Sequence, residues 1–292
     1  MSPGRQGMLL MAVVAVAWSG VEALAAHALQ GYSPYQTVWT RYAVHVGLML
    51  LVWGWREPGS LWRTDRPAFQ VARSLLMFAM PVSWVVAARH GVDSATLLAV
   101  FWVSPLLVIA FSGIFLSERA PAAVWVVGAL GCAAAWLALR PAHLSSWQSW
   151  LFPLLAALSF SLYVVMTRSL RGETGRVNLF YTALVVLLAL TPAMPAVWIP
   201  PSPADLAAFV GVGLLGYLVL LALDRAAAAT PVFMLAPFAY LQLVAALGLA
   251  WGMGQGRPGT ETAIAVVLIA AIALFMWMRD ASLLRPCDAG ES

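Results

Sequence analysis

The chain has 292 residues, of which 62% are hydrophobic and only 10% charged, and its formal net charge is +4. Ordinary soluble domains are about 25% charged, so this composition excludes a soluble globular protein. All 16 cationic side chains are arginine. Without lysine the chain can contain neither a Walker A phosphate loop nor a lysine Schiff base, which excludes a self-contained ATP-driven pump. The arginines are scattered over short connectors, which argues against a nucleic-acid partner.

Ten apolar stretches follow one another along the chain. A bilayer core about 30 Å thick is crossed by about 20 apolar residues, and connectors rich in proline and glycine separate stretches of that length. No stretch alternates as the strands of a membrane barrel do. The first stretch could imitate a signal peptide, but nine more follow it, which favours an uncleaved helix. The expected spans are 8–28, 36–55, 69–89, 94–116, 122–140, 149–169, 177–199, 206–225, 229–252 and 260–279.

The ten spans divide into two sets of five with related sequences. Residues 95–121 run from Ala-Thr-Leu through Ser-Pro to Ser-Glu-Arg-Ala-Pro, and residues 228–258 run from Ala-Ala-Thr through Ala-Pro to Gln-Gly-Arg-Pro. The copies differ, because Gln255 stands where the first has Glu118. Five is an odd number, so the second copy enters the membrane from the opposite side. This is the inverted-repeat plan of many secondary transporters, whose substrate site lies where the repeats meet.

The predicted fold is therefore an all-α integral membrane protein of ten transmembrane helices, arranged as two inverted five-helix repeats around a central cavity. We expect the repeats at 1–140 and 141–279, followed by a polar cytoplasmic tail at 280–292. Cys132 lies in a span and Cys287 in the tail, so a disulfide is not expected.

The orientation follows from the arginines. With the N-terminus inside, eleven arginines outside the spans or at their ends fall on the cytoplasmic side and three on the other. Positive charge is retained in cytoplasmic loops, so both termini are expected in the cytoplasm.

Ionisable residues inside spans are costly and are functional hypotheses by default. Glu22 and Arg41 fall at similar depth on consecutive spans, and His45 follows Arg41 one helical turn deeper. The trio is either a proton-coupling or carboxylate-binding site or a structural clamp, and the clamp is favoured because paired charges often only neutralise each other. Arg73 and His27 lie near span ends, and Arg73 is expected to snorkel.

Three prolines interrupt spans: Pro81 in the third, Pro105 in the fourth and Pro237 in the ninth. Each removes a backbone hydrogen bond and can kink its helix. Pro105 and Pro237 occupy equivalent points in the two repeats, so we expect hinges beside a central cavity, against the alternative of simple packing kinks.

Aromatic rings, methionines and isolated polar groups gather around these prolines. Each stripe taken alone is more often packed core than a binding site, but together they suit a large apolar or aromatic solute. Metalloprotease and nucleophile-elbow motifs are absent from the sequence, so no catalytic residue, metal or cofactor is expected. The candidate cavity residues of this kind are Met77, Met80, Trp84, Phe101, Trp102, Ser159, Tyr163, Tyr217, Phe233, Tyr240 and Gln242.

These features resemble the drug/metabolite transporter superfamily with its EamA-type repeats. The resemblance rests on residues 17–20 (Ala-Trp-Ser-Gly), on Arg41, and on the run from Ala95 through Pro105 to Arg119. It covers nearly the whole chain, although Ser117 replaces the glycine of the family's Leu-Gly-Glu-like turn. Its motifs describe the scaffold rather than the substrate.

The resemblance implies ten helices and transport of small metabolites without ATP hydrolysis. It places the cavity between helices three, four, eight and nine, with helices one and six contributing, which adds Trp18 and Ser19 to the candidates. Helix two is peripheral in the family, which favours the clamp for Arg41 and His45. Among bacterial members the sequence looks most like the exporters of aromatic and bulky apolar amino acids.

The expected function is therefore export of amino acids, aromatic ones or methionine, across a bacterial inner membrane by alternating access. The alternatives are a carrier or importer of another small metabolite or drug, and, from other classes, an intramembrane enzyme or a channel. The expected partners are the small-molecule substrate and the lipid bilayer. Proton coupling stays open, and a monomer is sufficient for this function.

Overall fold

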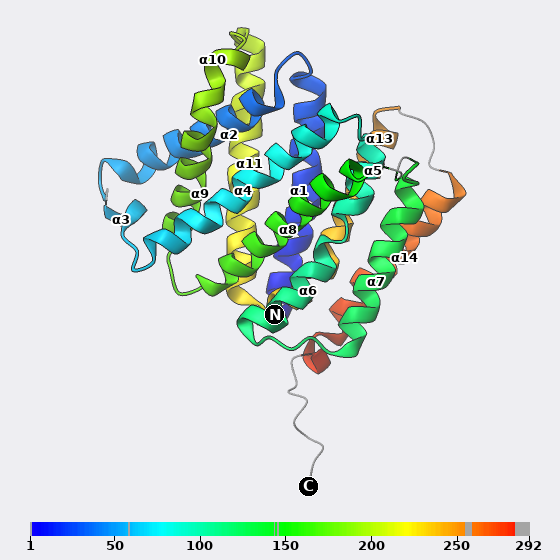
Figure 1. Ribbon diagram of the computed structural model, residues 1–292. Helices are drawn as coiled ribbons and strands as arrows, with labels where there is room; N and C mark the ends of the chain where they lie inside the picture. Colours follow the sequence, from blue (N-terminus) through cyan, green and yellow to red (C-terminus); the bar gives the residue numbers. More distant parts are fainter. Residues whose placement is uncertain (1, 58, 143, 145, 255–258, 284–292) are drawn as a thin grey trace.

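The computed structural model describes residues 2–57, 59–142, 144, 146–254 and 259–283 (Figure 1). The motif that begins at Gln255, the last residues of the tail and Cys287 lie outside these ranges. Across the described residues the regular structure is entirely helical. Nine segments in this part of the chain are long and apolar enough to cross a membrane, which confirms the predicted class of helical membrane protein.

The first half contains eight helical elements. They are α1 (Pro3–Ala28), α2 (Pro34–Met49), the π-helical turn η1 (Leu50–Gly54), α3 (Gly59–Trp62), α4 (Pro67–Arg89), α5 (Ser94–Phe101), α6 (Ser104–Leu116) and α7 (Ala122–Leu139).

The second half contains nine helical elements. They are α8 (Gln148–Ser169), α9 (Gly175–Leu190), the 3₁₀ turn η2 (Thr191–Ala193), α10 (Met194–Val197), α11 (Pro203–Ala229), α12 (Val232–Leu235), the 3₁₀ turn η3 (Ala236–Tyr240), α13 (Leu241–Gly252) and α14 (Thr260–Leu283).

The second predicted span differs from the other nine. Residues 34–54 are helical throughout, as α2 and η1, but this segment is not among the nine that qualify as membrane-crossing. α2 is only 16 residues long, and its polar residues Gln36, Arg41 and His45 lower the hydropathy of this segment. The count of ten transmembrane helices thus stays a prediction.

Several helices begin earlier than the hydropathy pattern predicted, because serine–proline pairs start them. Ser2, Ser33 and Ser202 each cap a helix through their side-chain oxygen, and a proline follows each of them. A serine N-cap satisfies a free backbone N–H, and proline suits the first helical position, where no N–H is needed.

The fourth and ninth predicted spans are broken in the middle. α5 ends at Phe101 and α6 begins at Ser104, with Pro105 in its first turn. In the second half α12 passes into η3, whose first turn contains Pro237. α4, by contrast, continues through Pro81. Two of the three expected interruptions therefore change the helix, and they stand at the equivalent points of the two halves.

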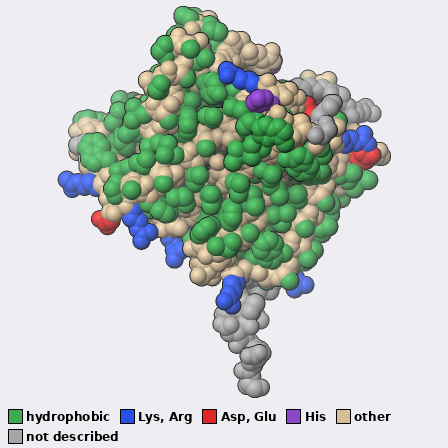
Figure 2. All heavy atoms as spheres, in the orientation of Figure 1, with side chains coloured by type: hydrophobic (Ala, Val, Ile, Leu, Met, Phe, Trp, Pro, Cys, Tyr) green, Lys and Arg blue, Asp and Glu red, His purple; other side chains and the backbone are tan. Residues whose placement is uncertain are grey.

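The helices pair in a reciprocal way. α1 packs on α11 as α8 packs on α4, and α2 contacts α11 as α9 contacts α4, while α7 pairs with α14. This pattern is unchanged when the two halves exchange roles. In Figure 1, α1 and α8 cross near the middle of the molecule, and α7 and α14 form one edge. Figure 2 shows hydrophobic side chains over the middle of one face and arginines along its lower left edge and bottom.

Candidate transport pathway

A small cavity of about 40 Å³ lies where the two halves meet. That volume holds about three water molecules, so the cavity is nearly closed. Among the described residues, no charged side chain lines it. Six of the predicted residues do: Trp18, Met77, Met80, Phe101, Trp102 and Gln242. The other lining residues are Met11, Val14, Ala15, Phe160, Leu220, Leu223 and Ala239.

Aromatic rings form a connected wall on one side of this cavity. Phe101 is the centre of the group, with ring centroids 5.5 Å from Trp84 and 5.7 Å from both Trp102 and Phe160. Trp102 lies 5.7 Å from Tyr240. Edge-to-face and tilted contacts at these distances are the favourable geometry for aromatic pairs. Trp84 thus supports the wall from behind, since it does not itself line the cavity.

Hydroxyl groups donate hydrogen bonds to backbone carbonyls at and near the helix breaks. Tyr240 donates from its hydroxyl to Trp102 O at 3.2 Å and to Gly128 O at 3.1 Å. Ser161 donates to Ser104 O at 3.0 Å, and Ser19 donates to Gln242 O at 2.8 Å. An unpaired carbonyl is costly at membrane depth, so these hydroxyls are what makes the broken helices tolerable.

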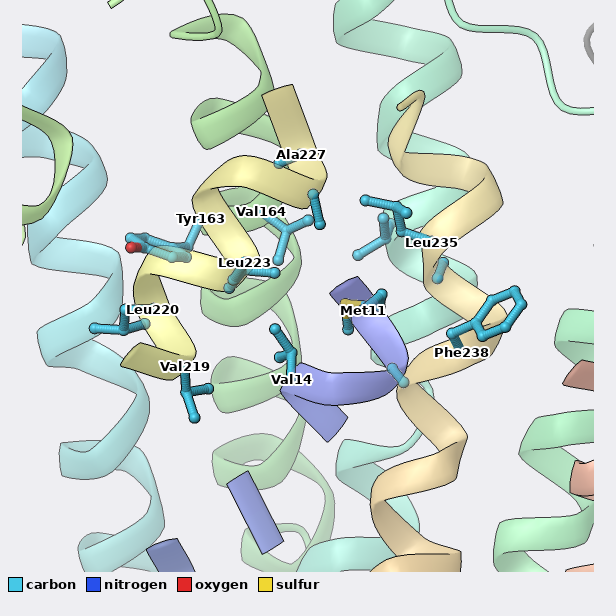
Figure 3. Packing of buried hydrophobic residues seen from close by; sticks show 14 of the residues in the cluster. Met11, Val14, Tyr163, Val164, Val219, Leu220, Leu223, Ala227, Leu235 and Phe238 are labelled. Carbon is cyan, nitrogen blue, oxygen red and sulfur yellow. The ribbon is translucent and has the colours of Figure 1, made fainter. Parts of the chain in front are cut away.

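Between the cavity and the side of the molecule that carries the N-terminus, an apolar layer fills the pathway. Only about 10 Å³ of space remains there. Figure 3 shows Met11, Val164, Leu223 and Leu235 approaching one another from four different helices. We call these four residues the plug. No solute passes such a layer without movement of the helices that carry it.

Beyond the plug, on the same side, a charged contact ties the two halves together. Glu118, in the connector after α6, accepts a hydrogen bond from Arg168 Nε at 2.7 Å and one from Val232 N at 3.0 Å. Arg168 also donates from Nη1 to Ala227 O at 2.9 Å and Ala228 O at 2.8 Å. Both charged side chains are largely buried. We call the Glu118–Arg168 pair the latch, since it joins the ends of α6, α8 and α11 to the start of α12.

The N-terminus of α1 is held at the same place. Thr230 donates to Pro3 O at 2.8 Å, and a Cβ at Gly7 would come within 2.1 Å of Thr230 Oγ1. Only glycine allows α1 to approach the link between α11 and α12 this closely.

On the opposite side of the cavity the expected charged trio assembles. Arg41 Nη1 lies 4.0 Å from Glu22 Oε1, and the guanidinium lies over the Trp18 ring at 5.4 Å from its centroid. The Glu22 side chain is 58% exposed. His45 is buried between the rings of Tyr42 and Tyr217, at 5.1 Å and 5.7 Å. Glu22 therefore lies at the surface of the helix bundle, and His45 lies in its packed interior.

Arg73 does not snorkel as expected. Its side chain is 1% exposed and donates to Thr167 Oγ1 at 3.1 Å, Gln70 Oε1 at 3.0 Å, Asn178 O at 2.6 Å and Thr182 Oγ1 at 3.0 Å. The amides of Gln70 and Asn178 connect it to a carboxylate, because Asn178 accepts from Gln70 at 2.7 Å and donates to Asp224 at 2.8 Å. Three helices supply the hydrogen-bond partners of Arg73, and these make its burial less costly than exposure to lipid.

The remaining candidates lie away from the cavity. Tyr163 packs under Arg73, whose guanidinium is 5.1 Å from the ring centroid, and Tyr217 packs on His45. Ser159 and Phe233 are buried but do not line the cavity.

Sequence reasoning missed Phe160, Met11 and the latch. Met11, Val14 and Trp18 recur at helical spacing on one face of α1, a signal that was available. Phe160 lies next to Ser159, on a different face of α8 from the one chosen. The latch could not be found, because Arg168 lies 50 residues beyond Glu118 and the motif that contains Glu118 does not indicate its partner.

The part of the chain that the structure describes contains no cluster of three or more metal-binding side chains.

The comparisons with known proteins agree with this architecture. A solved crystal structure superposes with a TM-score of 0.80 at 19% identity, over 95% of this chain and 97% of that one, which concerns the fold alone. Residues 5–140 match the EamA-like transporter family. The protein is a helical membrane transporter. Its similarity to the drug/metabolite transporter superfamily, through this family match and the relatives below, agrees with the predicted resemblance.

Curated relatives of the chain are transporters of different solutes. The S-adenosylmethionine uptake transporter of Rickettsia bellii is 27% identical over 73% of this chain and 74% of its own. The riboflavin transporter of Rhizobium johnstonii is 28% identical over 75% and 72%. The pseudopaline exporter of Pseudomonas aeruginosa is 25% identical over 92% and 96%. These names point away from an enzyme.

Proposed function

We propose that this protein is a secondary transporter of small metabolites that combine an amino-acid group with an aromatic or methionine-derived part. The observation that carries the proposal is the cavity lining, which offers Trp18, Phe101, Trp102 and three methionines but no charged group among the described residues. Such a surface suits flat rings and sulfur-bearing chains, and tryptophan faces also attract cations.

Two kinds of solute fit this description. Aromatic amino acids and methionine are the substrates expected from the sequence. S-adenosylmethionine, the solute named for one group of relatives, joins a methionine-derived chain to a purine. The relatives include uptake transporters and an exporter, so the proposal leaves the direction of net flux to the experiment.

We further propose that the chain sits in a bacterial inner membrane with both termini in the cytoplasm, as the arginine distribution indicates. In this orientation the plug and the latch close the cytoplasmic end of the pathway. Alternating access then requires the two five-helix halves to part there, and the breaks at Pro105 and Pro237 are the proposed hinges. The reciprocal pairing of helices supports the two-halves arrangement.

Counterflow in proteoliposomes tests the substrate class. Vesicles loaded with each unlabelled solute are given labelled S-adenosylmethionine, methionine, tryptophan or phenylalanine, with a sugar and riboflavin as comparison solutes. We expect exchange of at least one of the first four. Exchange confined to the comparison solutes would reject the proposal.

A matched pair of tryptophan variants tests the cavity. Trp102→Ala should reduce exchange at least tenfold, while Trp251→Ala, at an exposed position away from the cavity, should leave it unchanged. Both proteins must be recovered folded, as judged by gel filtration. Equal activity of the two variants would remove Trp102 from the substrate site.

Glu22→Gln separates the two roles left open for the charged trio. Loss of pH dependence with folded protein retained supports proton coupling. Loss of folded protein supports the clamp.

A further inference from the structure

A second hollow, of about 520 Å³, lies outside the transport pathway. It is bounded by α3, by the residues just before it and by the start of α9. Its lining residues are Glu57, Gly59, Ser60, Arg63, Thr174, Arg176 and Val177. The nearly closed cavity between the halves shares none of these residues.

The hollow is built by well-anchored elements. Leu61 of α3 is fully buried, and Tyr181 of α9 donates to Trp62 O at 3.2 Å. The π-helical turn η1 precedes it and leads the chain out of α2. π-helical turns are rare and occur frequently at functional sites.

One arginine in the hollow has its charge balanced and the other does not. Arg176 pairs with Glu57 at 3.1 Å, and its guanidinium lies 5.1 Å from the Trp53 ring centroid. The Arg63 side chain has no hydrogen-bond or ion-pair partner among the described residues. A Cβ at Gly59 would stand 2.9 Å from Arg63 Nε, so the glycine lets this guanidinium fold back over α3. The lining thus carries one uncompensated positive charge beside the hydroxyl group of Thr174.

The surroundings place the hollow at the depth of lipid headgroups. Trp55 and Trp62 are 69% and 48% exposed, and Arg56 lies over the Trp55 ring at 4.5 Å. Exposed tryptophans mark the membrane–water interface. Leu51 of η1, 73% exposed, continues this surface toward the apolar belt. Basic hollows between helices on the cytoplasmic side are suited to anionic headgroups.

We propose that this hollow binds a phosphate group, with Arg63 as its main ligand and Thr174 as a hydroxyl donor. The source is either the headgroup of an anionic phospholipid or free phosphate, since both offer the same oxygen acceptors to a guanidinium. The proposal does not depend on the transported solute.

Lipid binding to the purified full-length protein tests it without any transport assay. Native mass spectrometry is used to count phosphatidylglycerol and phosphatidylcholine molecules retained after titration. We expect preference for phosphatidylglycerol, reduced about fivefold in Arg63→Gln. Arg171→Gln, which removes an exposed arginine of the same region outside the hollow, is the matched control and should bind as the original protein does. Gly59→Ala, which displaces Arg63 without removing charge, should mimic Arg63→Gln.

A parallel titration with sodium phosphate separates the two sources. Phosphate that raises the thermal stability of the original protein but not of Arg63→Gln, without any lipid preference, identifies free phosphate as the ligand. Equal losses in Arg63→Gln and Arg171→Gln would show only general surface attraction and overturn the proposal. Absence of both lipid preference and phosphate stabilisation would overturn it as well.

Discussion

Ser117 forms the turn that ends α6. It ends α6 in the left-handed conformation, with φ of 56°, at the position where related proteins are expected to have glycine. The following residue, Glu118, donates a backbone hydrogen bond from its N–H to Ser112 O at 3.1 Å. This bond closes the turn and positions the latch carboxylate. The turn was predictable from the motif, but the role of the carboxylate beyond it was not.

Ser117→Gly should stabilise the protein. A non-glycine residue pays about 1–2 kcal/mol in the left-handed region, and the greater flexibility of glycine when unfolded offsets about 0.5–1 kcal/mol of that. The net gain of roughly 0.5–1 kcal/mol should raise the melting temperature in detergent by about 1–4 °C. Ser117→Ala keeps the strain and should give no gain. A lower melting temperature for the glycine variant would contradict this account.

Tyr32 links the connector between α1 and α2 to the start of α11. Its hydroxyl donates to Asp205 Oδ2 at 2.8 Å, and this hydrogen bond raises the pKa of Tyr32 above its usual value of 10.0. A raised pKa means that the folded state favours the protonated phenol. The contribution is therefore complete below pH 10 and is lost as the pH rises through the higher folded-state value.

Tyr32→Phe should accordingly lower the melting temperature slightly at pH 7 to 9, and the difference from the original protein should shrink at higher pH. Melting curves of both proteins, recorded from pH 7 to beyond pH 10, check it. A difference in melting temperature that grows with pH would show that folding lowers the pKa of Tyr32 rather than raising it. Asp205 also accepts from Ser202, so the capped start of α11 should survive the change.

Among the helices, the sequence predicted where breaks occur better than where helices begin. Pro105 and Pro237 lie in the first turns of α6 and η3, where a missing N–H costs nothing, and the chain breaks just before them. Pro81 has the same chemistry but α4 continues past it. Neighbouring helices decide between these outcomes, and a single sequence does not contain that information.

Polar residues at helix contacts were the least predictable part. Glu22 and Arg41 were found because depth can be counted along consecutive helices. The partners of Arg73 come from α4, α8 and α9, with Asp224 of α11 beyond them, so depth counting could not reveal them. In the sequence, a buried arginine cannot be distinguished from one that snorkels to the membrane surface, because the difference depends on how the helices pack.

Arg73→Ala should lower stability by at least about 2 kcal/mol, because four acceptors on two helices besides its own lose a charged donor. Arg66→Ala, at the exposed start of the same helix, should change it by less than about 0.5 kcal/mol. Thermal unfolding in detergent compares the two. If both melt at the same temperature, the Arg73 network is not a stabilising feature.

At the scale of the whole molecule, the plug and the latch close one end of the pathway that leads from the cavity. The side carrying the N-terminus is sealed twice, by apolar packing and by a buried charge pair. This double seal leads to a prediction about access.

Glu118→Gln should open the sealed side more often, since a largely buried charged hydrogen bond is worth about 1.5–3 kcal/mol. The measurement uses a Leu235→Cys reporter in the plug, with Cys132 and Cys287 replaced by serine. Labelling by a membrane-impermeant maleimide applied from the sealed side should become at least severalfold faster. Glu57→Gln, which breaks an exposed ion pair on the same side, is the control. Unchanged labelling would mean that the latch does not govern access.

The size of the central cavity has a thermodynamic consequence for selectivity. A space of about 40 Å³ admits no amino acid, so every solute must first be accommodated by separating the lining side chains. The cost of that separation is common to all solutes and weakens their apparent affinity by the fraction of molecules in the receptive form. Changes that favour the receptive form should therefore tighten binding of preferred and unwanted solutes by the same factor. Discrimination between them would stay a property of the rings and methionines alone.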